Sequence, residues 1–223
     1  DITLNNTNVL TGTVALNTSG STGNTTIDNG TTALIIAQSS VGGNLTLTSG
    51  HASGITDSGT VTVGGWLRAT TDANSGVINL GTLAVDAGIH LNTHGTGNAT
   101  AVNDTGFFFG GNGSTVGGNL NVTATTGNMT DNNDGSVTVA GTSSFTTSAN
   151  NATITLDDTD HAFTGAVSLN TTGSSAHATV IDTSGLNLAA STVGGNLIAT
   201  ATTGNMEDSG VLTIAGTSSF TTS

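Results

Sequence analysis

The pentapeptide VGGNL occurs three times in this chain, and the rest of the sequence keeps its spacing. The copies begin at Val41, Val116 and Val193, so they recur at a nearly constant interval. An interval of about 75 residues is far longer than a helical or strand period, but it suits a supersecondary unit copied in tandem. The strings ITL, INL and ITL, which begin at positions 2, 78 and 154, follow the same spacing. The sequence therefore predicts three units of about 76 residues each, at about 1–74, 75–150 and 151–223.

The composition favours an all-β fold. Of the 223 residues 34% are hydrophobic, which is enough to build a core, yet only one is Lys or Arg and none is Pro or Cys. Val, Ile, Leu and Thr recur in short alternating runs, which is typical of strands, and the 33 Gly residues join Asn, Asp and Ser in turns. The lack of Cys excludes disulfides and thiolate metal sites. No transmembrane segment is visible in the sequence.

A shorter spacing inside each unit predicts how the chain winds. Strings in which a Gly is followed by alternating apolar residues contain Val14, Leu45, Leu67 and Ile89. The first two of these residues are further apart along the chain than the later ones are from each other. A step of roughly 20 to 30 residues is the size of one coil of a parallel β-helix, and three such steps fill one unit. We expect a single β-solenoid array over residues 1–223 with about nine coils, on the order of 40 Å long at ~4.8 Å per coil. Both ends of the sequence resemble cuts in a longer repeat protein.

The alternation also predicts the core. In GNLTLTSG, Leu45 and Leu47 fall on one face of the strand, while Thr46 and Thr48 fall on the other. Phe145 and Phe220 occupy inward positions in matching strings. Stacked columns of such side chains should form the core, with each coil covered by its neighbours.

The repeated pentapeptide itself is interpreted as a structural corner before a strand. Its glycines suit a turn with positive φ or a close backbone approach, and its Asn suits a hydrogen bond to the residue's own backbone. The corner residues are Gly42, Gly43, Asn44, Gly117, Gly118, Asn119, Gly194, Gly195 and Asn196.

One acidic cluster, DDTD, is the candidate for a metal site. Asp157, Asp158 and Asp160 stand where the first unit has Asn5, Asn6 and Asn8, which favours a solvated turn that accepts either residue type. Calcium is the alternative, since carboxylate oxygens could converge there, although the spacing matches neither an EF-hand nor a calcium-binding β-roll repeat. The sequence contains no other cofactor motif and no catalytic set of residues, so we expect no enzyme. Asp57, Asp131 and Asp208 recur at matching positions and are interpreted as turn residues.

The histidines and the single Trp and Arg carry little functional signal. His51, His90, His94, His161 and His177 show no metal-ligand spacing, and we expect all five at the surface. Trp66 and Arg68 occur in one unit only, which marks either a local binding spot or a divergent coil.

The strings VGGNLTLTSG, GNMEDSGVLTIAGTSSFTTS and ATITLDDTDHAFTGAVSLNTTG resemble the degenerate strand repeats of filamentous-haemagglutinin-like adhesins, which are giant bacterial surface and secreted proteins. This resemblance covers essentially the whole chain. It implies a right-handed parallel β-helix that forms the shaft of a long exported filament. The secretion domain found at the amino terminus of that family is not in this sequence.

The expected function is therefore a structural shaft of an extracellular or cell-surface filament or adhesin. Expected partners are further copies joined end to end or the continuation of a longer chain, together with a cell-surface or carbohydrate target. The net charge of −13 argues against nucleic acid as a partner. An ice-binding solenoid, suggested by Thr46 with Thr48 and Thr123 with Thr125, is one alternative. A carbohydrate-active β-helix enzyme that uses Asp158 with Asp160 is another.

Overall fold

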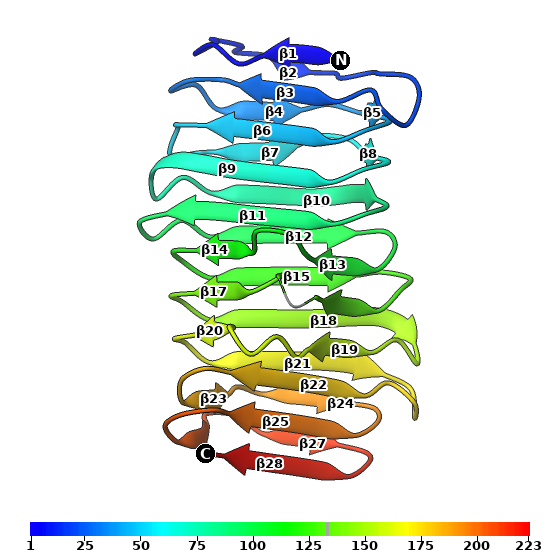
Figure 1. Ribbon diagram of the computed structural model, residues 1–223, viewed down its shortest axis with the longest axis vertical. Helices are drawn as coiled ribbons and strands as arrows, with labels where there is room; N and C mark the ends of the chain where they lie inside the picture. The colour runs from blue at the N-terminus through cyan, green and yellow to red at the C-terminus, as the bar shows by residue number, and fades with distance from the viewer. Residues whose placement is uncertain (133) are drawn as a thin grey trace. The chain divides into compact units, whose positions relative to one another are not determined.

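The computed structural model describes residues 1–132 and 134–223, and it shows an all-β parallel β-solenoid of about ten turns. The prediction of the fold class is thus confirmed, and the number of coils was underestimated by about one. Within the described residues the chain forms 28 strands and no helix. Figure 1 shows that strands stacked on one another run in the same direction.

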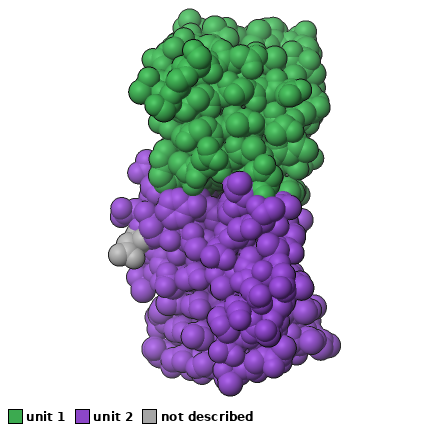
Figure 2. Space-filling model, turned by 90° about the vertical axis from the view of Figure 1, so that its right-hand side faces the viewer, with its two compact units in different colours: residues 1–104, 115–119 green, residues 105–114, 120–223 purple. Residues whose placement is uncertain are grey.

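The chain divides into two compact units, coloured separately in Figure 2. Unit 1 comprises residues 1–104 and 115–119, and unit 2 comprises residues 105–114 and 120–223. Each unit is a stack of turns in which parallel strands of successive turns pair side by side.

Unit 1 contains three stacks of strands, one on each side of its turns. The first consists of β1 (Ile2–Leu4), β3 (Thr25–Asp28), β6 (Leu45–Ser49), β9 (Leu67–Asn74), β11 (Ile89–His94) and β14 (Ser114–Val116), whose Thr115 pairs with Asn92. The second consists of β2 (Thr13–Val14), β4 (Leu34–Ile36), β7 (Ile55–Asp57), β10 (Ile78–Val85) and β12 (Ala99–Asn103). The third consists of β5 (Ser39–Val41), β8 (Val61–Val63) and the last residues of β10.

Unit 2 is built in the same way. One stack consists of β13 (Phe107–Phe109), β16 (Met129–Asp131), β19 (Ile154–Leu156), β22 (Ala178–Asp182), β25 (Leu197–Ala201) and β28 (Ser218–Thr222). Another consists of β15 (Leu120–Ala124), β18 (Ser143–Asn150), β21 (Val167–Thr172), β24 (Ser191–Val193) and β27 (Leu212–Ile214). Its other pairs are β17 (Val137–Val139) with β20 (Ala162–Phe163), and β23 (Leu186–Leu188) with both β21 and β26 (Met206–Asp208).

The length of one turn differs from the prediction at its first step. In the first stack of unit 1 the paired residues are at positions 2, 25, 45, 67 and 89, so successive turns are nearly equal in length. Val14 pairs with Ile36 in the second stack and not with Leu45, so the long step predicted between Val14 and Leu45 joined two different sides. A turn of about 22 residues does not divide evenly into a sequence repeat of about 75 residues. Three turns are shorter than one sequence repeat, and the remaining residues of the repeat carry the chain to the next side of the solenoid.

Successive copies of a motif therefore lie on different sides of the solenoid. In unit 1, Ile2 lies in β1 and its copy Ile78 lies in β10, which belong to different stacks. In unit 2, Leu120 of the second VGGNL lies in β15 and Leu197 of the third lies in β25, again in different stacks. The sequence repeat is thus about three and one-third turns long.

Alternating side chains fill the interior, as the sequence predicted. In unit 1 the paired positions Ile27, Leu47, Ala69 and Leu91 form one column, and all four are fully buried. Burying a large aliphatic side chain such as Ile or Leu stabilises a protein by roughly 1.5–3 kcal/mol. The interior of each turn is therefore completed by the turns above and below it.

Four phenylalanines with large buried side chains form a cluster in unit 2. The centroids of Phe145 and Phe163 lie 5.6 Å apart with an interplanar angle of 70°, which is an edge-to-face arrangement. Phe107 and Phe109 continue the cluster, and all four side chains are at most 1% exposed. Phe220 was expected in the same environment but is 51% exposed, because the described residues place no further turn over β28.

Candidate functional site

The VGGN corners bring consecutive turns into close contact. A Cβ added to Gly42 would overlap the carbonyl oxygen of Gly20 in the preceding turn. Gly117 stands in the same relation to Gly95, and Gly194 to Gly173. None of these three pentapeptide glycines has a positive φ. Close backbone approach, and not a left-handed conformation, therefore explains why glycine occupies them.

The Asn that follows these glycines links one turn to the next. The backbone N–H of Trp66 donates to Oδ1 of Asn44 over 2.9 Å, and the N–H of Thr217 donates to Oδ1 of Asn196 over the same distance. Asn119 makes the corresponding bond with its own N–H, which donates to Oδ1 of Asn98 over 2.8 Å. These bonds run between turns, and not within the residue's own turn as the sequence suggested. The corner residues thus form a ladder that fixes the spacing of the turns.

The DDTD segment adjoins a buried acid–base pair in unit 2. Nε2 of His161 and Oδ2 of Asp131 lie 2.5 Å apart, and both side chains are fully buried. The N–H of Val137 donates to Nδ1 of His161 over 2.9 Å, so the proton of a neutral imidazole is on Nε2 and is donated to Asp131. The N–H of Asp158 is a second donor to Oδ2 of Asp131, over 3.0 Å.

This geometry shifts the pKa of the carboxyl groups in opposite directions. Burial acts to raise the pKa of Asp131, but the hydrogen bond from His161 and those from the DDTD backbone outweigh it, so the pKa lies below its usual value. Burial, followed by the nearby charge of Asp131, raises the pKa of Asp157. Burial is also the main cause that raises the pKa of Asp182, which accepts hydrogen bonds from Ser184 and Phe163.

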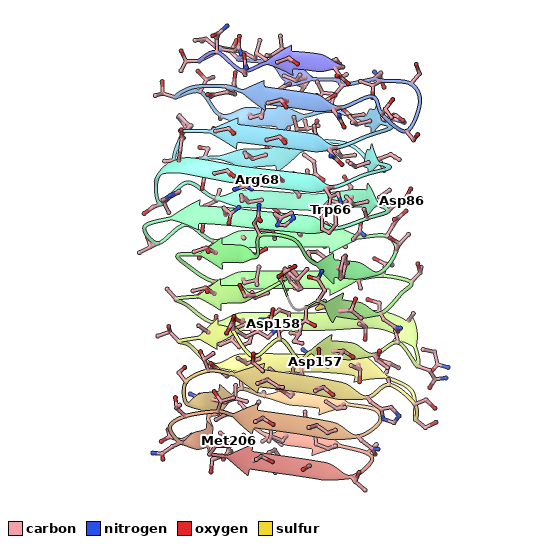
Figure 3. All side chains as sticks on the ribbon, viewed as in Figure 1. Trp66, Arg68, Asp86, Asp157, Asp158 and Met206 are labelled. Atoms are coloured by element: carbon pink, nitrogen blue, oxygen red, sulfur yellow. The ribbon has the colours of Figure 1, made fainter. Side chains whose placement is uncertain are left out.

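The three candidate calcium ligands do not converge. Asp157 is exposed and lies beside Asp131, whereas Asp158 is 5% exposed and accepts a hydrogen bond from the N–H of Asp160 over 2.8 Å. Figure 3 marks Asp157 and Asp158 at neighbouring positions of the loop. Asp158 and Asp160 line an open groove of about 530 Å³, whose other lining residues are Gly111, Asn112, Asp134 and Ser136. Over residues 1–132 and 134–223 no group of three or more His, Asp or Glu side chains is placed to hold a metal ion.

The prediction that all five histidines lie at the surface was wrong for two of them. His161 is fully buried and His90 is 7% exposed. The segment that holds His161 contains an insertion, because Ile154 and Val167 are one residue further apart than their copies Ile2 and Val14. That extra residue distinguishes this segment from its copy in the sequence, but it does not by itself indicate that His161 is buried.

Trp66 and Arg68 lie close together on unit 1 but differ in environment (Figure 3). The ring of Trp66 packs against His90 with centroids 5.3 Å apart, and a Cβ on Gly88 would overlap the indole. Arg68 is exposed in β9, where its backbone is paired between Thr46 and His90. Trp66 therefore acts as a cover over the neighbouring turn, a role that the sequence did not reveal.

Three ranges of this chain, 22–95, 96–170 and 175–223, match the family model described as repeats of unknown function (DUF5649). No curated protein and no solved structure matches the chain. The three matched ranges follow one another at the spacing of the sequence repeat and together cover most of the 223 residues. The chain therefore belongs to the family of DUF5649 repeats.

Proposed function

We propose that the chain is a structural segment of an extracellular or cell-surface filament, the shaft of an adhesin. The observation that carries this proposal is that the repeated residues serve as structural contacts between turns. The copies of VGGNL make contacts between turns, and within unit 2 the last residues of the second and third copies, Leu120 and Leu197, lie in different stacks. A repeat of this kind extends a solenoid by a fixed amount without copying a ligand site along one face.

The charge of the chain supports the same role. A net charge of −13 with Arg68 as the sole Lys or Arg keeps a long surface soluble and repels nucleic acid and anionic lipid. No helix in the described part of the chain is long and apolar enough to cross a membrane. The resemblance to filamentous-haemagglutinin-like adhesins extends the proposal to a bacterial exported protein. A cell-surface or carbohydrate target then belongs to the assembled filament.

The two alternative functions find less support in the geometry. Ice binding needs a flat, regular row of Thr on successive turns, but Thr46 has Arg68 on one side in the sheet and Thr48 has Asp28. A glycan-cleaving enzyme needs accessible carboxyl groups that share a substrate. Of the two carboxyl groups in that alternative, the one of Asp158 is buried to all but 5% and accepts a hydrogen bond from the N–H of Asp160 over 2.8 Å.

Duplication of one repeat tests the proposed shaft. A variant in which residues 96–170 occur twice in tandem gains about three and one-third turns, which at ~4.8 Å per turn is about 16 Å of added length. Electron microscopy and small-angle scattering measure this length against the original chain. Unchanged length, or glycan turnover that is lost in the Asp158→Ala variant, would overturn the proposal.

A further inference from the structure

The outward face at the start of strand β9 carries the two rarest side chains of the sequence. Trp66 is the sole Trp and Arg68 is the sole Lys or Arg among the 223 residues. Because they are two residues apart, both point away from the interior; Arg68 is exposed and Trp66 is partly exposed (Figure 3). The matching positions of the second sequence repeat hold Thr142 and Ser144. The repeat therefore forms the same strand without either of these large side chains.

The following turn is shaped to receive the indole. A Cβ on Gly88 would overlap Cζ3, Cε3 and Cη2 of Trp66, so the six-membered ring lies over Gly88. The buried ring of His90 packs against the indole with centroids 5.3 Å apart. In unit 2 the residue that follows Thr142 one turn later is Ala166, so the glycine accompanies the Trp and not the Thr. The indole is thus seated on the sheet, and its uncovered part faces solvent.

Arg68 has no carboxylate partner in the described part of the chain. The only ion pair among the described residues joins His161 to Asp131, although the sequence contains 14 Asp and Glu. Around Arg68, nine outward positions of three consecutive turns form a surface that we call the β9 patch. None of the nine is acidic, in a chain whose net charge is −13. The β9 patch consists of Asn44, Thr46, Thr48, Trp66, Arg68, Thr70, Gly88, His90 and Asn92.

An aromatic surface beside a guanidinium group fits a sugar ring that bears a carboxylate. The face of an aromatic ring is electron-rich, so it attracts the C–H groups on the apolar face of a sugar ring. A guanidinium group can donate two parallel N–H hydrogen bonds to one carboxylate. The hydroxyl groups of Thr46 and Thr70 and the amide of Asn92 can exchange hydrogen bonds with the sugar hydroxyls.

The single cation also limits the charge of the ligand. A polyanion such as a nucleic acid is held by several Lys and Arg side chains, whereas this chain offers one. The net charge of −13 repels a polyanion as a whole. One carboxylated ring within an otherwise neutral glycan needs only one guanidinium group, so it matches the β9 patch better.

We propose that the β9 patch binds a hexuronic acid residue of a glycan, with the sugar ring stacked on Trp66 and its carboxylate held by Arg68. This inference rests on the proposed adhesin shaft, because it names the class of target and where on the chain it binds. Strand β9 is paired on both sides, with β6 and β11. The patch is therefore complete within three neighbouring turns of unit 1.

Fluorescence titration tests the binding, because Trp66 is the sole Trp and the chain has no Tyr. Methyl glucuronide and methyl glucoside are the probes, since they share a sugar ring and differ in the carboxylate. Methyl glucuronide is expected to change the emission of Trp66 saturably. It is also expected to bind at least threefold tighter than methyl glucoside, which is the effect of one exposed ion pair. Equal affinities, or unchanged emission with both sugars, would overturn the proposal.

Two variants test whether Arg68 holds the carboxylate. Arg68→Gln is expected to weaken the binding of methyl glucuronide at least threefold, to the level of methyl glucoside. Combining it with Thr62→Arg restores the net charge at an exposed position of β8, which belongs to another stack of unit 1. The double variant is expected to bind like Arg68→Gln alone. Recovery of the preference for methyl glucuronide would show that net charge sets it, and would overturn the role of Arg68.

Trp66→Thr tests the stacking, since the other repeats hold Thr142 and Thr217 at the matching position. Saturation-transfer NMR of the sugar signals measures binding in the absence of the Trp, and circular dichroism checks that the variant is folded. The affinity for both sugars is expected to fall at least threefold. Unchanged binding by the folded variant would overturn the stacking role of the indole.

The two proposals fail in different ways. If tandem duplication of residues 96–170 adds length but neither sugar binds, the glycan site is overturned and the shaft is retained. If methyl glucuronide binds as expected but duplication adds no length, the result counts against the shaft alone.

Discussion

Nε2 of His161 lies 2.5 Å from Oδ2 of Asp131 in the interior of unit 2, where neither side chain reaches solvent. The Asp comes from the end of β16 and the His from the segment that covers it one turn later. Because Val137 fixes the other ring nitrogen, both hydrogen-bonding groups of the imidazole are used. The pair therefore joins two turns at a place where the repeats themselves differ.

Replacing His161 is expected to destabilise unit 2 strongly. In His161→Phe the carboxylate of Asp131 remains buried and loses its charge-stabilising donor, which costs about 3–5 kcal/mol. Asp131→Asn is expected to cost less, about 1–3 kcal/mol, because an amide oxygen still accepts from Nε2. Urea unfolding measures both, and Asp160→Asn at the exposed end of the loop is the matched control, expected within about 0.5 kcal/mol of the original chain. A loss in His161→Phe no larger than in the control would contradict the role assigned to the pair.

Asp182 should make the chain less stable as the pH rises. Its pKa in the fold is raised above the ordinary value of 3.8, chiefly by burial, so the folded state holds the proton more tightly than the unfolded state. The stability from this group is complete below pH 3.8 and is lost as the pH rises through the raised pKa. The stability difference between the original chain and Asp182→Asn should therefore shift in favour of Asn across that range. Urea midpoints measured from pH 3 upward test this, and a difference independent of pH would refute it.

The corner glycines should tolerate no side chain. Gly42→Ala places a methyl group against the carbonyl oxygen of Gly20, and overpacking of this kind costs about 1–3 kcal/mol. Gly12→Ala is the control, since no atom beyond its two chain neighbours lies within 4 Å of its added Cβ. Thermal unfolding monitored by circular dichroism compares the two variants. Equal melting temperatures would show that the corners are not in close contact.

Trypsin should leave the folded chain intact. Arg68 is the sole Lys or Arg in the sequence, and its strand β9 is paired on both sides with β6 and β11. Cleavage requires that this segment leave the sheet, so it should follow unfolding. Mass spectrometry is expected to show the intact chain in buffer and two fragments, 1–68 and 69–223, in urea. Rapid cutting in buffer would mean that β9 opens locally.

Much of this fold was predictable because strand alternation and tandem repeats are local signals. The inward positions of Leu45, Leu47 and Phe145 follow from a period of two, and they are buried as predicted. The prediction that Val14 and Leu45 are one coil apart was wrong because similar strings that begin with Gly occur on more than one side of the turn. Only the pairing of strands distinguishes those sides.

The acid–base pair was not predictable in the same way. Asp131 and His161 are 30 residues apart in sequence and meet only because one turn covers another. The sequence suggested that Asp131 was a turn residue and that His161 lay at the surface. His161 is instead fully buried, and nothing in the local composition indicated that burial. The calcium interpretation of Asp157, Asp158 and Asp160 likewise depended on convergence that their spacing alone could not establish.

The mismatch between the length of the repeat and the length of a turn has an evolutionary consequence. Each gene duplication that inserts one sequence repeat rotates the residues after it by about a third of a turn around the axis of the solenoid. Three such duplications restore the original orientation. A surface substitution that arises in one unit and is then copied would point outward in three directions. Growth of the array by duplication would thus place copies of a surface feature on three sides of the solenoid instead of on one.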